Sequence, residues 1–216
     1  MGYARPSKSN RLRRILPLLF VVLGLGLLGY VGYQYWDMYH TQQQLEAQWE
    51  RQAASAAAPG LPKQIPAADT LTRVSIPRIN MDAIVVEGAS RKQLSIGPGH
   101  MIDTAMPGEP GNAVITGHRD TFFRHIYELK KGDEIIIRRN GQVFKYQVTG
   151  KKIVEPEDIS VLKPTEDPQL TLITCYPTYY IGPAPKRLVI FSKLAQPTSE
   201  RQAGPMDQAS AHAADN

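Results

Sequence analysis

Two patterns of apolar residues divide the chain into an N-terminal segment and a folded body. The first is one unbroken apolar run from Ile15 to Trp36, which contains no charged residue. At 1.5 Å per residue, a helix over this run is about 33 Å long and can cross a hydrocarbon core of roughly 30 Å. The second pattern, over residues 71–195, consists of short apolar runs separated by Gly, Pro and Asn, and it predicts β-strands.

The residues around the long apolar run predict a membrane anchor and its orientation. Five basic residues and no acidic residue precede it, and four aromatic residues crowd its C-terminal end: Arg5, Lys8, Arg11, Arg13 and Arg14, then Tyr30, Tyr33, Tyr35 and Trp36. The positive-inside rule therefore predicts a cytoplasmic basic segment (1–14), a transmembrane anchor (15–36) in the plasma (inner) membrane, and an extracytoplasmic remainder. A cleaved signal peptide is the alternative, but its apolar region is shorter and ends close to an A-x-A-like site, which is missing here.

The body reads as an all-β domain with a few short helical turns. The clearest signal is the run "DEIIIRRNGQVFKYQVTG", in which Asn140-Gly141 predicts a tight hairpin. About eight strands are expected over 71–195, closed or nearly closed into a β-barrel with long loops. Because no alternation of strands and helices is visible, parallel pairing is not expected.

The segments that flank the body differ from it in composition. Residues 37–70 predict an extracytoplasmic linker, whose first part is rich in Gln, Ala and Glu and can extend as a helix, and whose Pro-rich part (59–66) predicts a semi-rigid spacer. The polar, Ala-rich residues 196–216 predict a disordered tail.

Composition and charge exclude some functions. The 216-residue chain carries a net charge of +5, much of which comes from the N-terminal basic cluster. No stripe of Lys and Arg interleaved with aromatic residues indicates nucleic-acid binding. No set of His, Cys and carboxylate residues has the spacing of a metal site, so neither a metal nor a cofactor is expected.

The chain has one cysteine, Cys175, at the end of the predicted strand "QLTLITC". A lone extracytoplasmic cysteine is either a small buried residue or a reactive thiol. Pro177 follows closely and cannot continue the strand ladder, so the sulfur is expected at a strand end, where a cleft can form.

Two further residues are placed to act with that thiol. His118 follows the predicted strand "NAVITG", so it also lies at a strand end, whereas His100 falls in a Pro/Gly loop and His125 in a short helical turn. Arg187 begins the last predicted strand and, as a permanently charged donor, could stabilise an oxyanion.

The segments "ITGHRDTFF", "LTLITCYP" and "APKR" together resemble the sortase family of membrane-anchored cysteine transpeptidases. The connection "CYPTYYIGPAPKR" is most similar to class D. The resemblance implies an eight-stranded sortase-type β-barrel, with Cys175 as the nucleophile, His118 as the acid/base and Arg187 as the oxyanion or substrate stabiliser. It implies cleavage of an LPXTG-like C-terminal sorting motif through a Cys thioester, and transfer to an amine acceptor on a cell-wall precursor or another protein.

Neighbouring residues are expected to contact the substrate, and two other functions stay open. Thr174 is expected to orient the substrate backbone, and the loop residues Tyr176, Tyr179 and Tyr180 to form a wall of the groove. One alternative is another extracytoplasmic cysteine transpeptidase, of the L,D-transpeptidase type, although that type has Arg directly after Cys. The other is a membrane-tethered β-barrel binding module with an inert cysteine.

Overall fold

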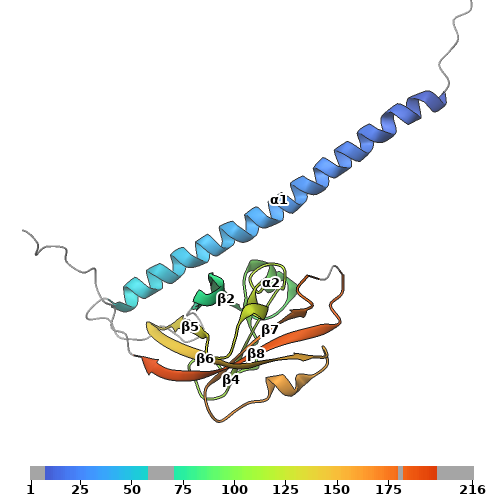
Figure 1. Ribbon diagram of the computed structural model, residues 1–216. Coiled ribbons are helices and arrows are strands. Elements are labelled where there is room, and N and C mark those ends of the chain that lie inside the picture. Colours follow the sequence, from blue (N-terminus) through green and yellow to red (C-terminus); the bar gives the residue numbers. More distant parts are fainter. Residues whose placement is uncertain (1–7, 58–70, 180–181, 199–216) are drawn as a thin grey trace, which may run out of the picture.

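The computed structural model describes residues 8–57, 71–179 and 182–198 (Figure 1). Tyr180, the Pro-rich spacer and the chain beyond residue 198 lie outside the described residues. The body is a closed barrel in which the strands follow the order β1-β2-β3-β4-β7-β8-β6-β5. The strands are β1 (Thr72–Ile76), β2 (Met81–Glu87), β3 (Gly99–His100), β4 (Asn112–Gly117), β5 (Glu134–Arg139), β6 (Gln142–Val154), β7 (Gln169–Tyr176) and β8 (Lys186–Thr198).

The predicted number of strands is confirmed, but two strands differ from the expectation. β3 lies within a stretch that was expected to be loop, and β6 continues as one long strand through Gly150, where the quoted hairpin run ends. β6 shifts its register against β8 between Val148 and Gly150. Such a bulge adds one residue to one strand and so interrupts the alternation of apolar and polar residues. In the sequence, this interruption at a glycine resembles the end of a strand.

The predicted hairpin at Asn140-Gly141 connects β5 to β6. Both residues have positive φ, 53° and 70°, as a type I′ turn requires. At the C-terminal end, β8 runs on to Thr198, past the boundary predicted at residue 195, because Gln196, Pro197 and Thr198 continue the antiparallel ladder with β6.

The expectation that parallel pairing would be absent is wrong. β4 lies parallel to β7 from Asn112↔Gln169 to Gly117↔Thr174, and β2 lies parallel to β3. The long connection between β4 and β7 contains the β5–β6 hairpin and two 3-10 helices, η3 (Ile126–Glu128) and η4 (Ile159–Leu162), rather than a crossover helix. A sequence signal based on strand–helix alternation therefore misses it.

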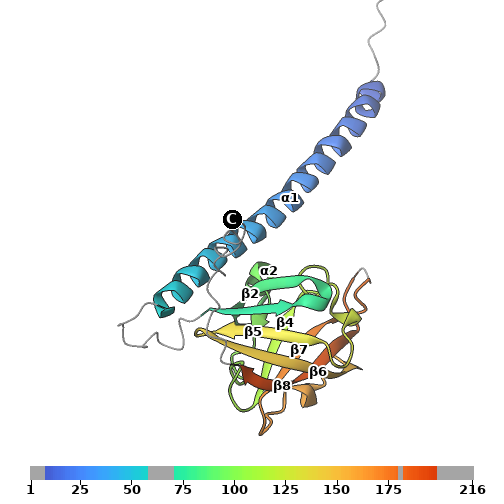
Figure 2. The same ribbon diagram turned by 60° about the vertical axis from the view of Figure 1, so that its left-hand side comes forward.

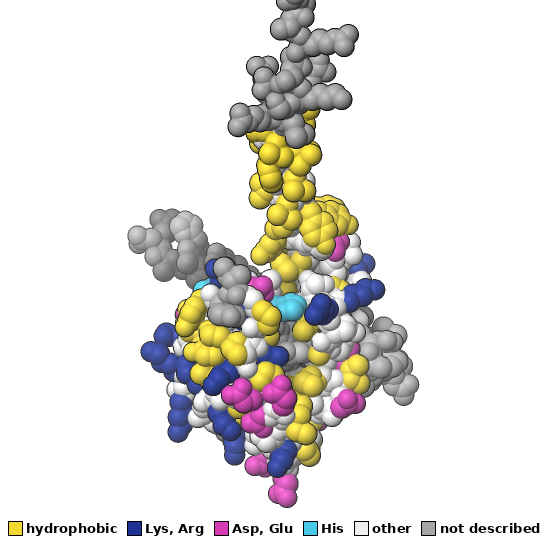
Figure 3. All heavy atoms as spheres, turned by 90° about the vertical axis from the view of Figure 1, so that its right-hand side faces the viewer, with side chains coloured by type: hydrophobic (Ala, Val, Ile, Leu, Met, Phe, Trp, Pro, Cys, Tyr) yellow, Lys and Arg dark blue, Asp and Glu magenta, His cyan; other side chains and the backbone are white. Residues whose placement is uncertain are grey.

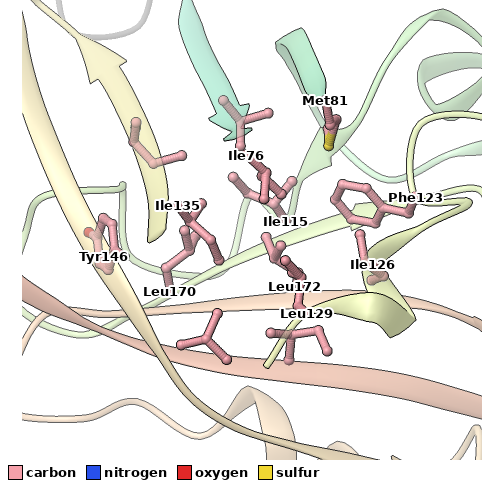
Figure 4. Packing of buried hydrophobic residues seen from close by; sticks show 14 of the residues in the cluster. Ile76, Met81, Ile115, Phe123, Ile126, Leu129, Ile135, Tyr146, Leu170 and Leu172 are labelled. Carbon is pink, nitrogen blue, oxygen red and sulfur yellow. The ribbon is translucent and has the colours of Figure 1, made fainter. Parts of the chain in front are cut away.

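The barrel interior is filled by apolar side chains from all around the wall (Figure 4). Alternate residues of β7 illustrate the pattern, since Leu170 and Leu172 are fully buried in this core while Ile173 packs into a second cluster on the other face. At the end of β4, Gly117 leaves room for the ring of Phe123, because a Cβ at that position would lie 2.8 Å from it. The turn that follows β4 is therefore closed tightly over the end of the barrel.

The N-terminal helix α1 (Lys8–Ala57) is continuous and reaches the barrel with its C-terminal half (Figures 1 and 2). Gln42 is 9% exposed; its Nε2 donates to Ile84 O at 3.3 Å and Ile96 O at 2.8 Å, and its Oε1 accepts from Ile84 N at 3.1 Å. The guanidinium of Arg73 lies 5.2 Å from the ring centroid of Trp49. Part of the predicted linker is thus a helix packed against β1, β2 and α2 (Arg91–Ile96).

Candidate active site

The parallel pairing of β4 with β7 brings the predicted histidine and cysteine to one edge of the barrel. Gly117 is the register partner of Thr174, so the next residues, His118 and Cys175, leave the ladder side by side. The hydroxyl of Thr174 donates to Gly117 O at 2.7 Å and is buried, so it ties the two strand ends together.

Arg187 reaches the same place from the other side. In the antiparallel pair of β7 and β8, Cys175 is directly opposite Arg187. Directly opposed residues point their side chains to the same face of a sheet. One half-buried cysteine is therefore flanked by the histidine-bearing end of β4 and by the arginine at the start of β8.

Side-chain alternation shows that Cys175 and Arg187 point to the outer face of the barrel. Ile173 and Val189, two residues away on the same strands, pack against Val154 and Val161 in a cluster separate from the barrel core. The segment around η4 covers this cluster. The site therefore lies on the outer surface of the barrel, where β4, β7 and β8 form its floor and the η4 segment borders it. It is not a cavity inside the barrel.

A buried amide holds the η4 segment in place. Asn112 Nδ2 donates to Val161 O at 3.0 Å and to Lys163 O at 3.3 Å, and Asn112 Oδ1 accepts from Thr171 Oγ1 at 2.7 Å. Both side chains are buried, so these bonds are shielded from water. Nothing in the sequence pattern singled out Asn112, because a single Asn at the start of an apolar strand is also a common turn residue.

The guanidinium of Arg187 has donors to spare. Its Nη1 donates to Lys186 O at 3.0 Å and to Ala184 O at 3.3 Å. In the part of the chain that the structure describes, these bonds use Nη1 alone, which leaves Nη2 and Nε for a bound oxygen. No hydrogen bond between Cys175 and His118 is present among the described residues; contacts of this kind often tighten only when substrate binds.

Arg119, which the sequence analysis did not single out, holds the loop between β7 and β8. Its Nη1 donates to Pro177 O at 3.1 Å and its Nη2 to Gly182 O at 2.6 Å. Because Arg119 directly follows His118, one guanidinium connects the histidine turn to both limbs of the loop that follows Cys175. The position of Arg119 directly after His118 is the feature of the sequence that could have identified it.

The residues expected to contact substrate lie in three different settings. The side chain of Thr174 is directed to Gly117 O and is 1% exposed, which leaves only its backbone for a ligand. Tyr176 packs against the barrel core with one side, and Tyr179 is 84% exposed. Tyr176 and Tyr179 both line a groove with a volume of about 670 Å³.

The two other histidines of the body have local partners. His125 is exposed, and its Nδ1 lies 2.8 Å from Glu128 Oε1. His100 is 2% exposed, with Nδ1 2.9 Å from Glu87 Oε2 and Nε2 2.9 Å from Ala105 O. Among the described residues, no group of three or more His, Cys, Asp or Glu could hold a metal ion.

Comparison with known proteins identifies this arrangement. Residues 74–195 match the model of the sortase domain. The chain belongs to the sortase family. It is 33% identical over 195 residues to sortase D of Bacillus subtilis (strain 168), covering 84% of this chain and 98% of that protein. This similarity, together with that to a solved sortase D structure, places the chain in class D.

Solved sortases share its barrel. A sortase D5 transpeptidase from Clostridium perfringens superimposes with a TM-score of 0.58 at 26% identity, over 73% of this chain and 98% of that one. Sortase A from Corynebacterium diphtheriae gives a TM-score of 0.55 at 31% identity, over 64% of this chain and 63% of that one. The predicted sortase-type β-barrel is confirmed, and this sortase is a cysteine transpeptidase that acts on sorting-signal substrates.

Replacing Arg119 tests its role in holding the loop. Arg119→Ala removes both hydrogen bonds to the loop, and Arg119→Lys cannot reach both carbonyls with one ammonium group. We expect faster amide hydrogen exchange at Thr178, Tyr179 and residues 182–185, and a peptide-cleavage kcat/KM lower by at least about tenfold, because two hydrogen bonds from a charged group to the loop are lost. Arg91→Ala, which replaces an exposed arginine at the start of α2, is the matched control. If the amide hydrogen exchange rates in the loop are the same in the Arg119 variants as in wild type, Arg119 does not hold the loop.

Titration of His100 tests its structural role. Burial lowers its pKa, but the hydrogen bonds to Glu87 and to Ala105 O outweigh burial, so the pKa of His100 is raised in the folded chain. A raised pKa means that its stabilisation is complete below about pH 6.5 and is lost as the pH rises through the folded-state value. We expect the free energy of unfolding of wild type, relative to Glu87→Gln, to fall by on the order of 1 kcal/mol from pH 6 to pH 8. Parallel pH profiles for the two proteins would show that the pair contributes nothing.

Proposed function

We propose that this sortase uses Cys175 as its nucleophile, His118 as its general acid and base, and Arg187 as the donor to the oxyanion. The observation that carries the proposal is the strand register, in which Cys175 of β7 opposes Arg187 of β8 and directly follows the last β4–β7 pair, as His118 does on β4. In this arrangement a reacting carbonyl over Cys175 has a cationic donor on one side and an imidazole on the other.

The first half of the reaction forms a thioester. The reacting form of the pair is a Cys175 thiolate beside a protonated His118, which holds the proton that the thiol has lost. Cys175 Sγ attacks the carbonyl carbon of the peptide bond after the Thr of an LPXTG-like sorting motif, and the oxygen becomes an oxyanion. The free donors of Arg187 stabilise that charge. When the tetrahedral intermediate collapses, His118 gives a proton to the leaving nitrogen, the C–N bond breaks, and the C-terminal fragment departs.

The second half transfers the acyl group. The amine of a cell-wall precursor or of another protein attacks the thioester carbon, and His118 accepts the proton that this nitrogen loses. The new amide forms as the C–S bond breaks, and Cys175 returns to its starting state. A covalent intermediate divides one difficult amide exchange into two easier steps.

The surrounding groups support binding of an extended peptide. The exposed face of the floor runs between the η4 segment, held by Asn112, and the β7–β8 loop, held by Arg119. We propose that Tyr179 and Tyr180 contact the bound chain from the loop side, that Tyr176 positions the loop, and that Thr174 serves through its backbone and by fixing the strand ends.

We also propose that α1 anchors the protein in the plasma membrane with the barrel on the extracytoplasmic side. The helix is long and apolar enough to cross a membrane once, and its apolar window is not buried against the rest of the chain. The basic cluster before it supports a cytoplasmic N-terminus.

Acyl transfer is tested by mixing the detergent-solubilised chain with a library of LPXTG-like peptides and measuring intact mass. We expect a covalent acyl adduct on wild type that hydroxylamine releases, and none on Cys175→Ala. If no peptide gives an adduct and Cys175 resists alkylation, the assigned nucleophile is wrong and the inert binding module gains support.

Arg187→Lys tests the oxyanion assignment with the adduct assay as its readout. Lysine keeps the charge but loses the planar fork of donors, so we expect adduct formation to slow by roughly 100- to 1,000-fold. Lys186→Ala removes the neighbouring exposed cation, which lies 3.4 Å from Glu155, and should change the rate less than twofold if the effect is specific to Arg187. Equal slowing in both variants would contradict the assignment.

A further inference from the structure

The contacts between α1 and the barrel follow a fixed order along the helix. Tyr35 and Met38 line a groove of about 350 Å³ together with Thr121, Phe122 and His125, which belong to the turn after the catalytic histidine. Further along α1 come Gln42 with its bonds to Ile84 and Ile96, then Trp49 with Arg73, then Gln52, whose Oε1 accepts from Leu71 N. The catalytic end of the barrel is therefore the end nearest to the apolar part of the helix.

The distances along the helix put that end at the membrane surface. The predicted membrane span ends at Trp36, and Met38 lies only about 3 Å further along the axis, whereas Gln52 lies about 24 Å further. In Figures 1 and 2, the side of the barrel where β7 ends and β8 begins lies toward the N-terminal half of α1. The β5–β6 hairpin lies near the C-terminal end of α1.

The surface at the catalytic end has the composition of a membrane-facing patch. A groove of about 670 Å³, which shares His125 with the groove under α1, is lined by three cationic side chains and by exposed apolar or aromatic ones: Arg124, Lys151 and Lys152, with Tyr127, Ile153 and Tyr179. We call these six residues the rim patch. Tyr127 is 43% exposed, Ile153 45% and Tyr179 84%.

No acidic residue lines this groove in the part of the chain that the structure describes. Lys152 lies 3.9 Å from Asp158, and Lys151 donates to Tyr127 O and Leu129 O, but both residues are exposed. Figure 3 looks onto this end and shows hydrophobic side chains with Lys and Arg beside them below the apolar stretch of α1, and most of the acidic side chains lower on the barrel.

We propose that the rim patch rests on the anionic headgroup surface of the bilayer that α1 crosses. Exposed aromatic side chains at the level of the headgroups and cations that face anionic lipid are the two ingredients of interfacial binding. The docked helix keeps the patch at that level, and the active site then opens beside the membrane. This inference rests on the proposed anchor, and it adds a second, electrostatic contact between the barrel and the membrane.

The depth of the patch is measured on the full chain in nanodiscs of phosphatidylglycerol. In the Cys175→Ala background, single spin labels are placed by Tyr179→Cys, by Ile102→Cys on the β3–β4 loop, and by Leu23→Cys in the predicted span; Ile102 is 70% exposed and serves as the matched apolar control. We expect the spin label at 179 to be more accessible to oxygen, and less accessible to a water-soluble nickel chelate, than the label at 102.

The Leu23 label separates the two proposals. If it lies within the bilayer while the label at 179 is as accessible to nickel as the label at 102, the rim patch does not touch the membrane and this inference is overturned. If the Leu23 label is itself in water, the anchor is overturned, and the contact proposed here falls with it. The acyl-transfer chemistry stands in either case.

Charge reversal tests the electrostatic part. A cation near an anionic membrane surface favours the bound orientation by about fivefold, so Arg124→Glu should lower the ratio of bound to unbound orientation by roughly 25-fold and shift the label at 179 toward water. Lys163→Glu, an exposed lysine beyond η4, should leave it in place, and nanodiscs of phosphatidylcholine should weaken contact in wild type. An Arg124→Glu chain whose label stays protected in phosphatidylglycerol would contradict the electrostatic contact.

Discussion

The active site depends on the parallel pairing of β4 with β7. Neighbouring parallel strands end at the same edge of a sheet, so Gly117↔Thr174 brings the residues after each strand together. The bond from Thr174 Oγ1 to Gly117 O, made where water is excluded, resists fraying at the point where the ladder stops. An antiparallel pair would have put His118 and Cys175 at opposite ends of the barrel.

Two buried or half-buried polar side chains connect these paired strand ends to the segments that border the site. Asn112 joins the floor to the η4 segment, and Arg119 joins the histidine turn to the β7–β8 loop. Each uses several donors of one side chain to hold segments that are distant in sequence. The geometry of the wall is thereby coupled to the same strand ends that carry the proposed catalytic residues, and the docked helix fixes the position of that edge relative to the proposed membrane span.

Much of this could be predicted from the sequence, and the failures have physical causes. Cys175, His118 and Arg187 stand at ends of apolar runs, which pattern reveals directly, and the Asn140-Gly141 turn carries its own signal. The parallel pair was missed because its crossover contains a hairpin and not a helix. Thr174 was expected to face the substrate, because sequence shows adjacency to Cys175 but not which face a side chain takes. Asn112 and Arg119 act through long-range bonds to carbonyls, which leave no mark on local pattern.

A crystal structure of the chain with a peptide substrate analogue bound covalently to Cys175 would test the assigned site most directly. We expect the peptide to lie on the outer face, between the η4 segment and the β7–β8 loop, with its carbonyl oxygen within hydrogen-bonding distance of Arg187 and its leaving-group side toward His118. A peptide that lies elsewhere, or a carbonyl oxygen directed away from Arg187, would contradict the assignment.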